Sequence, residues 1–195
     1  ADNDVNDGIY TWSGPNANST TAKVKLQIKN SSDIILAEKF STGNFTIDAN
    51  PPTGSITLAL PLNGAWVSST PSFYWSATGL TDVTNMAVIV DGAYLIQGLS
   101  PTAANSFYQT PDSLALSDGW HTWTVRGLDA AGNWVQATQT WSIRVDATPP
   151  AQFSLNTPTN DIWLASKNPT FSWNPSMDNG SGMLKYQVFV NNTLK

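Results

Sequence analysis

The feature that most constrains this chain is an internal repeat of 98 residues. Pro51-Pro52 recurs as Pro149-Pro150, and Pro-Ser-Phe-Tyr-Trp at 71–75 recurs as Pro-Thr-Phe-Ser-Trp at 169–173, each 98 positions on. Two independent anchors at one spacing indicate internal duplication. A repeat of about a hundred residues has the size of one β-sandwich, so we expect tandem sandwiches.

The repeat divides the chain into one whole unit and two partial units. Residues 51–148 form the complete unit, and 149–195 repeat only its first strands, so they form the N-terminal half of a further unit. Residues 1–50 resemble the second half of a unit, because 7–12 match 118–123, 30–35 match 129–134 and 45–48 match 143–146. Residues 13–22 are an insertion rich in Gly, Asn, Ser and Thr, for which we expect a mobile surface loop.

The complete unit reads as an all-β fold of about seven strands. Apolar residues alternate with polar ones, and Pro, Gly, Asn and Asp interrupt the pattern every eight to twelve residues or so. The expected strands are 54–60, 72–77, 85–90, 93–97, 105–109, 120–128 and 133–145, with 153–155, 170–174 and 186–191 in the last unit. Helices should be single turns at most, because no stretch sustains a period of about 3.6 residues.

The alternation also predicts which side chains face the core. Trp123 and Val125, and again Trp141, Ile143 and Val145, lie at every second position and therefore share one face of a strand. The opposite face carries Arg126, Ser142 and Arg144, which we expect in solvent. Asp129-Ala-Ala-Gly-Asn133 between two such runs predicts a hairpin, since Gly and Asn adopt the positive φ of tight turns.

These residues make the chain similar to a known family. Trp75 and Trp173 fall on second strands, the hairpin at 129–133 follows 123–126, and Asp-x-x-Pro-Pro occurs at 48–52 and 146–150. With them the chain resembles the immunoglobulin-like and fibronectin type III-like repeats of bacterial and archaeal cell-surface proteins. The resemblance implies tandem sandwiches in spacers, adhesin stalks, filaments or accessory modules of secreted enzymes. The chain lacks the antibody-type cysteine pair, so we expect its core to rest on Trp75 and Trp123.

Composition narrows the partners and the location. The net charge is −5 and Lys and Arg are nowhere clustered, so nucleic acid is not an expected partner. No stretch reaches the about 18 apolar residues of a membrane helix, and no signal-peptide pattern starts at Ala1, so any signal peptide was removed or lies upstream. The absence of cysteine fits a reducing compartment or a surface protein without disulfides. The Asn, Thr, Ser and Gly content favours the extracellular location.

Little in the chain suggests catalysis. His121 is the only histidine, Glu38 the only glutamate, and cysteine is absent, so a two-glutamate glycosidase site within one chain is excluded. His121 sits inside a predicted strand with no motif around it. We therefore expect no catalytic residue, no cofactor and no enzymatic activity.

Two loops could hold calcium. Asp2, Asp4, Asn6 and Asp7 offer side-chain oxygens at alternating positions, but the run lacks a glycine at the sixth loop position and a downstream bidentate acid. The alternative is a solvated acidic turn leading into a strand. The loop beginning at Asp178 is a weaker candidate, because its glycines already explain it as a turn.

Surface chemistry offers two further candidates. Trp75, Trp123, Trp141 and Trp173 are expected in the core, whereas four tryptophans near strand ends could form a platform for surface glycans: Trp66, Trp120, Trp134 and Trp163. Five asparagines start glycosylation sequons, of which the first and fourth lie in expected loops: Asn18, Asn30, Asn44, Asn179 and Asn191.

We interpret the chain as a non-enzymatic extracellular structural or adhesive repeat protein, such as a stalk, an adhesin segment or a filament subunit. The alternative is a carbohydrate-binding or spacer module of a secreted hydrolase. The expected partners are adjacent repeats or neighbouring copies of the chain. The two half-units are completed either by strands of a longer array in the same chain or by strand addition between copies, which would polymerise head to tail.

Overall fold

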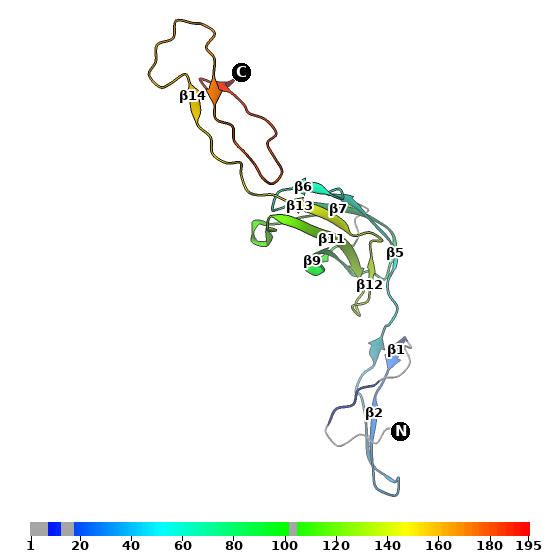
Figure 1. The fold of residues 1–195 in the computed structure, drawn as a ribbon. Helices are drawn as coiled ribbons and strands as arrows, with labels where there is room; N and C mark the ends of the chain where they lie inside the picture. The colour runs from blue at the N-terminus through cyan, green and yellow to red at the C-terminus, as the bar shows by residue number, and fades with distance from the viewer. Residues whose placement is uncertain (1–7, 13–17, 102–104) are drawn as a thin grey trace.

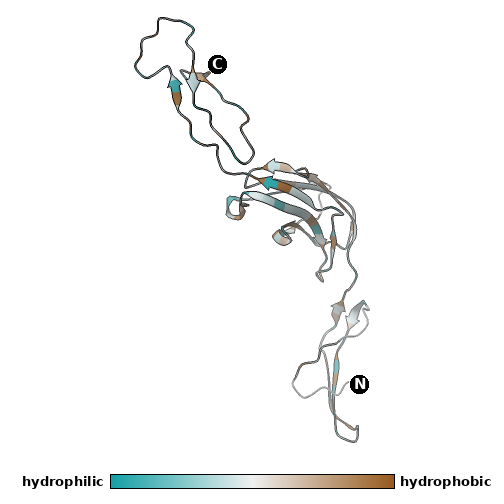
Figure 2. Ribbon diagram, viewed as in Figure 1, coloured by the Kyte–Doolittle hydropathy of each residue, from teal (hydrophilic) through white to brown (hydrophobic). Residues whose placement is uncertain are grey.

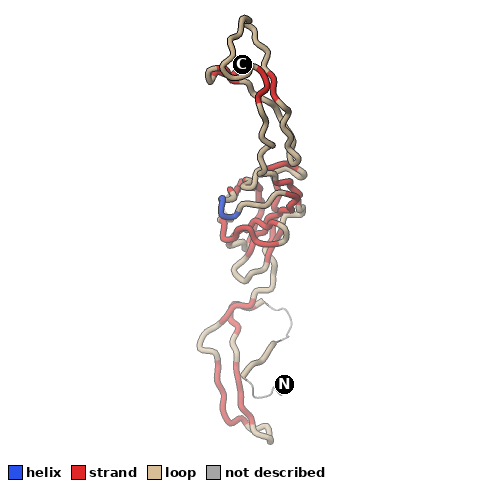
Figure 3. The backbone as a smooth tube through the Cα atoms, turned by 60° about the vertical axis from the view of Figure 1, so that its left-hand side comes forward, coloured by secondary structure: helices blue, strands red, loops and turns tan. Residues whose placement is uncertain are grey.

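The computed structural model describes residues 8–12, 18–101 and 105–195, and it consists of strands joined by turns and loops (Figure 1). A central body (residues 51–148, the central unit) lies between an N-terminal segment (residues 8–47) and a C-terminal segment (residues 149–195). The three parts lie in a row in two views related by 60° (Figures 1 and 3). The only helical turn among the described residues is the 3₁₀ turn Asp112–Leu114. The all-β prediction is confirmed.

The central unit is a sandwich of two sheets. The smaller sheet has the order β10-β7-β5, formed by Asn105–Gln109, Ser72–Thr81 and Thr53–Leu60, and all its pairs are antiparallel. The larger sheet has the order β6-β13-β11-β8-β9, formed by Ala65–Val67, Trp141–Val145, Gly119–Leu128, Asn85–Val90 and Ala93–Leu99. Strand β12 (Trp134–Gln136) also pairs with β11. The β6–β13 pair is parallel, whereas the other pairs of this sheet are antiparallel.

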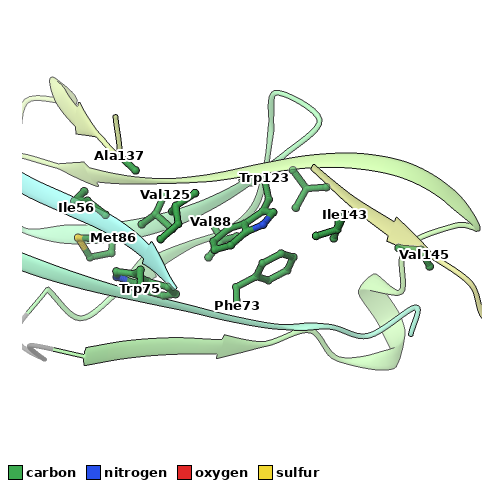
Figure 4. Close-up of a cluster of buried hydrophobic side chains, with 12 residues drawn as sticks. Ile56, Phe73, Trp75, Met86, Val88, Trp123, Val125, Ala137, Ile143 and Val145 are labelled. Atoms are coloured by element: carbon green, nitrogen blue, oxygen red, sulfur yellow. The ribbon is translucent and has the colours of Figure 1, made fainter. Parts of the chain in front are cut away.

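The core lies between the two sheets, and its largest buried side chains are aromatic (Figure 4). Trp75 from the smaller sheet and Trp123 from the larger one are 2% and 1% exposed. The rings of Phe73 and Trp123 pack with centroids 4.9 Å apart, and Trp141 meets the edge of Trp123 at 5.9 Å. Val125, Ile143 and Val145 are buried as the alternation predicts. The core residues expected from the sequence are therefore confirmed, except that Trp141 is only half-buried.

The strand expected at 133–145 is interrupted, so this prediction was wrong. Gln136 faces Arg126, and Trp141 faces Trp123. Between these two pairs the chain advances by five positions on one side, whereas β11 covers only three on the other. The extra residues form a bulge, which the donation from Ala137 N–H to the Val125 carbonyl (2.9 Å) still ties to β11. Strand β6 was not anticipated, because three residues are too few to reveal a periodicity.

The N-terminal segment contains two antiparallel pairs of strands. Strand β1 (Ser19–Ala22) pairs with β4 (Phe45–Ile47), and β2 (Lys25–Lys29) pairs with β3 (Ile35–Phe40). The expectation of a loop through residue 22 was wrong for its last four residues, and residues 13–17 lie outside the described residues. Figure 2 shows hydrophobic residues in this segment, and many of them are exposed to solvent.

The pairing also corrects the sequence match of residues 7–12. Ser19 faces Ile47 as Gly119 faces Val145, so β1, and not residues 9–12, occupies the place of the β11 start. Residues 9–12 form no strand. The match of residues 7–12 relied on residue similarity alone, whereas the register of β1 is set by its pairing with β4. The match of 30–35 with 129–134 is supported, because Asn30 N–H donates to the Ile34 carbonyl just as Asp129 N–H donates to that of Asn133, both at 3.0 Å.

The C-terminal segment has short strands around an incomplete aromatic cluster. Its strands are β14 (Leu155–Thr157), β15 (Ser172–Trp173), β16 (Phe189–Val190) and β17 (Thr193–Leu194). Tyr186 packs against Trp173 and Phe153, with centroids 5.2 and 5.6 Å away. Strand β14 has the expected length but starts two residues later than 153–155, whereas β15 and β16 are shorter than the strands expected at 170–174 and 186–191. Trp173, which was expected in the core, is only half-buried.

Candidate functional site

Hydrogen-bonded side chains and carboxylates meet at the two linkers that join the three parts of the chain. At the first junction (residues 48–52), Ala49 N–H donates to Asn18 Oδ1 at 2.9 Å, and Asn18 Nδ2 donates to Asp48 Oδ1 at 3.1 Å. Asn133 Nδ2, from the central unit, donates to the Asp48 carbonyl at 3.0 Å. The linker is therefore held from both of the parts that it joins.

Three carboxylates converge at the first junction. Asp48, Asp82 and Asp129 each place an oxygen within 4.8 Å of the other two, and they form the one such group of His, Cys, Asp and Glu side chains found among the described residues. Asp82 has a φ of 63°, in the left-handed region that Asp tolerates better than most residues. Oxygen ligands of this kind suit a hard divalent cation, so these three residues could hold one.

Asp129 is buried and yet ionised. Burial raises its pKa, but hydrogen bonds from the Asn133 side chain and from the backbone N–H groups of Asn133 and Ala131 lower the pKa below its ordinary value. Asn133 Nδ2 reaches Oδ2 at 2.8 Å, and the two N–H groups reach Oδ1 at 2.9 and 2.8 Å. The carboxylate therefore closes the predicted hairpin and presents negative charge at the junction.

The second junction (residues 146–150) repeats the cap of the first. Ala147 N–H donates to Asp118 Oδ1 at 2.7 Å, as Ala49 donates to Asn18. Asp146 accepts from Ser181 N–H in the following segment at 2.6 Å. Side-chain and backbone hydrogen bonds from Ser181 lower the pKa of Asp146. A Cβ at Gly180 would overlap this carboxylate, so glycine permits the close approach of the loop.

A cavity of about 660 Å³ opens at the second junction. Its wall from the central unit includes Trp66, Trp120 and Arg144, and its wall from the C-terminal segment includes Met177, Asp178 and Asn179. The linker and its cap contribute Asp146 and Asp118. The cavity thus combines aromatic rings with carboxylates and one guanidinium.

Strand register assembles the aromatic wall. On the outer face of the larger sheet, Arg144 of β13 faces Trp66 on one side and Trp120 on the other. Its guanidinium carbon lies 4.9 Å from the centroid of the Trp66 ring and 4.2 Å from that of Trp120. The rings remain 43% and 58% exposed, so one cation holds two accessible indoles in place.

The four proposed platform tryptophans are not together. Trp66 and Trp120 share the cavity, whereas Trp134 lies beside Arg126, whose guanidinium carbon is 4.2 Å from its ring centroid. Trp163 is 98% exposed in the C-terminal segment. Sequence reasoning missed the role of Arg144, which was expected only to face solvent, as were Arg126 and Ser142. The available signal was its alternation on a strand that neighbours Trp120.

The structure places both residues that were considered for catalysis in contacts between strands and turns. His121 contacts Asp91 and the Ser117 carbonyl, at 2.6 and 2.8 Å. Glu38 lies on the exposed strand β3 and pairs with Lys25 at 3.0 Å and Gln27 at 2.9 Å. These contacts link strands and turns.

The calcium candidates and the sequon asparagines fall in different parts of the structure. The calcium candidates Asp2, Asp4, Asn6 and Asp7 lie outside the described residues. Asp178 uses Oδ1 to accept the N–H groups of Gly180 and Gly182, as expected of a turn. All five sequon asparagines are exposed: Asn18, Asn30, Asn44, Asn179 and Asn191. The Asn18 amide is committed to the first junction.

A second cavity, of about 740 Å³, lies within the C-terminal segment. Its lining is mainly apolar and includes Phe153, Leu155, Phe171, Trp173, Tyr186 and Phe189. In the central unit, the equivalent side of the smaller sheet is covered by the larger sheet. Phe171 and Trp173, the repeat counterparts of the buried Phe73 and Trp75, are thus partly exposed in this groove.

Comparisons with known proteins give no family. No protein-family model matches the chain, and neither does any curated protein. Among solved structures, the fibronectin(III)-like modules of Clostridium thermocellum CbhA are 13% identical, with a TM-score of 0.31 over 46% of this chain and 92% of theirs. A Ca²⁺-stabilized adhesin of an Antarctic bacterium is 16% identical, with a TM-score of 0.32 over 71% of this chain and 35% of its own.

An endo-β-1,4-mannanase from Thermotoga petrophila is 13% identical, with a TM-score of 0.37 over 52% of this chain, which spans only 21% of the enzyme.

The strand order decides the fold class: β7 pairs with both β5 and β10 in one sheet, while β6, β13, β11, β8 and β9 form the facing sheet. The fold is immunoglobulin-like. No helix among the described residues is long and apolar enough to cross a membrane.

Proposed function

We propose that this chain is a non-enzymatic, extracellular structural or adhesive repeat protein, whose immunoglobulin-like units are held in line as a stalk. The observation that carries the proposal is the pair of capped junctions. Each Asp-x-x-Pro-Pro linker is fixed by a side chain of the preceding part and touches a loop of the following part. Proline fixes φ and removes a donor, so such linkers are stiff.

Scattering by the full chain in solution tests the stalk. A compact chain of this length would have a radius of gyration of about 16 Å. We expect a clearly larger value and an elongated distance distribution. The double variant Asn133→Ala, Asp146→Ala removes one hydrogen-bonding side chain at each junction and should broaden that distribution. A compact wild-type particle would contradict the proposal.

Absence of activity is tested separately. The purified chain should turn over neither polysaccharides nor peptides, because His121 and Glu38 serve structural contacts. Turnover that survives repurification and disappears in His121→Gln or Glu38→Gln would show that the chain is an enzyme. The rival proposal, an accessory module of a secreted hydrolase, predicts a catalytic domain encoded next to these repeats.

We also propose that copies of the chain associate by strand complementation. The apolar groove of the C-terminal segment and the exposed Leu26, Ile28 and Leu36 of the N-terminal segment support this, because each is half of a core. In the central unit, β11 pairs with β8. By the matched hairpins, β2 corresponds to the second half of β11, and residues 185–190 correspond to β8. Strand β2 of one copy would therefore pair with residues 185–190 of the next.

Sedimentation of the full chain over a hundredfold range of concentration tests this association. We expect concentration-dependent oligomers that are lost in the variant Leu26→Asp, Ile28→Asp, whose charges cannot enter the groove. Thr20→Asp, on the neighbouring strand β1, is the matched control. A chain that stays monomeric throughout would exclude complementation between copies and leave the stalk proposal standing.

Glycosylation of the sequons and calcium binding near the N-terminus are two further proposals. Asn179 and the other sequons would carry glycans in a host that glycosylates asparagine, and mass spectrometry of the native protein decides this. Calcium at Asp2, Asp4, Asn6 and Asp7 is tested by calorimetric titration of the Asp2→Asn, Asp4→Asn variant against the unmodified chain, because only the latter should release the corresponding heat.

A further inference from the structure

We propose that the cavity at the second junction binds a neutral saccharide. Two exposed indoles, hydrogen-bonding side chains and a net negative charge meet there, in a space of about 660 Å³. This volume falls within the range of about 300–1,000 Å³ that is usual for small-ligand sites. The proposal goes beyond the stalk proposal, because a stalk needs no ligand, but it rests on the same alignment of the two units at the second junction.

The aromatic wall suits the apolar face of a sugar ring. Trp66 and Trp120 are held from one side by Arg144 and remain accessible elsewhere. An indole offers a broad apolar face with a polar edge, and sugar C–H groups pack on such a face. The guanidinium between the rings removes much of their rotational freedom. Binding therefore costs less ordering than it would on mobile side chains.

The polar wall provides hydrogen-bond partners for hydroxyl groups. Asp118 is fixed through Oδ1 by the Ala147 N–H, and Asp178 through Oδ1 by Gly180 and Gly182. The second oxygen of Asp118 already accepts the Thr148 hydroxyl, but a carboxylate offers about four lone pairs, so both carboxylates can accept further hydrogen bonds. The exposed Asn179 amide offers both a donor and an acceptor. These groups come from both parts that meet at the junction, so the pocket is complete only when the two units are aligned.

Charge selects the class of saccharide. Three carboxylates, those of Asp118, Asp146 and Asp178, line the cavity with one opposing charge, that of Arg144. Arg144 is already placed against the two rings. A uronic acid or sulfated sugar would bring further negative charge toward this excess and would be repelled. A neutral sugar avoids that repulsion and can use the carboxylates as acceptors.

Titration of the full chain with neutral and acidic oligosaccharides tests the proposal. The probes are cellohexaose, mannohexaose and xylohexaose, with hexagalacturonic acid as the charged comparator, and the readouts are tryptophan fluorescence and calorimetry. We expect at least one neutral probe to bind and the charged one to bind at least about tenfold more weakly. Failure of all three neutral probes at millimolar concentration, or tighter binding of the acid, would overturn the proposal.

Matched variants locate the binding. Trp120→Ala should weaken the affinity about tenfold or more, and Trp66→Ala should also weaken it. Trp134→Ala is the control, since Trp134 is similarly exposed and also beside an arginine, but lies outside the cavity. Affinity should change less than twofold there. Equal losses in Trp120→Ala and Trp134→Ala, or no loss in Trp120→Ala, would place binding elsewhere. Unchanged scattering and thermal melts for each variant separate this result from a loss of the stalk.

Discussion

His121 Nδ1 lies 2.6 Å from Asp91 Oδ2, and this contact ties strand β11 to the turn between β8 and β9. The other oxygen of Asp91 accepts the Thr122 N–H at 2.8 Å, and His121 Nε2 lies 2.8 Å from the Ser117 carbonyl. Burial lowers the pKa of His121, but the hydrogen bonds with Asp91 and Ser117 outweigh it and raise that pKa above 6.5. Burial raises the pKa of Asp91, and bonds from Thr122 and His121 bring that pKa below 3.8.

The pair should make stability depend on pH in a defined window. A raised histidine pKa stabilises the fold fully below 6.5, and that contribution is lost as pH rises through the folded pKa. A lowered aspartate pKa stabilises above 3.8, and that contribution is lost as pH falls through the folded pKa. The pair therefore contributes most between these values. Urea unfolding of His121→Gln should show a flatter decline above pH 6.5 than the wild type; parallel curves would contradict it.

Trp75→Ala should destabilise the central unit by about 3 to 5 kcal/mol, because it removes a fully buried ring from the core. Trp75→Phe should cost less. The Trp75 indole N–H is buried without a hydrogen-bond partner among the described residues, and phenylalanine removes that unsatisfied donor. Thermal melts of both variants are the measurement. A shift below about two degrees for Trp75→Ala would mean that this ring is not part of the core.

Gly180→Ala should loosen the second junction without destabilising the central unit. Its new methyl group would overlap the Asp146 carboxylate and break the contact with Ser181 N–H. Scattering should then report a broader distribution of shapes, while the main melting transition stays within about one degree. Gly43→Ala is the control, since nothing lies within 4 Å of a Cβ there. Identical scattering of the two variants would show that the contact does not stiffen the linker.

Asp82→Asn should stabilise the chain in chelator at low salt, by about 1 to 3 °C. The substitution removes one of three carboxylates that lie within 4.8 Å of one another, and asparagine tolerates the φ of 63°. The gain should shrink at high salt, because salt screens the repulsion. Asp112→Asn, at an exposed helical turn, is the control. A loss of stability in low salt would show that the Asp82 charge is favourable where it stands.

The sequence predicts the sandwich well because its evidence is local. The alternation around Trp123 and Val125, and the hairpin closed by Asp129, lie within a few residues of one another and fix the face and the turn. The bulge after Gln136 was not predicted because apolar and polar residues alternate on both sides of it, throughout residues 134–145. The cavity at the second junction was not predicted for another reason. Trp66, Asp118 and Asn179 are dozens of positions apart, and only the parallel β6–β13 pairing and the folded linker bring them together.

The parallel β6–β13 pair also decides how the central unit responds to pulling. The chain enters the sandwich at β5, just before β6, and leaves at the end of β13, on opposite sides of the body (Figure 1). Ala65, Trp66 and Val67 face Ile143, Arg144 and Val145, and the bonds Gly64 N–H to the Ser142 carbonyl and Asp146 N–H to the Val67 carbonyl extend the ladder. Tension between the two ends shears these two strands along their length. The hydrogen bonds between them therefore bear the force together and break together rather than one at a time.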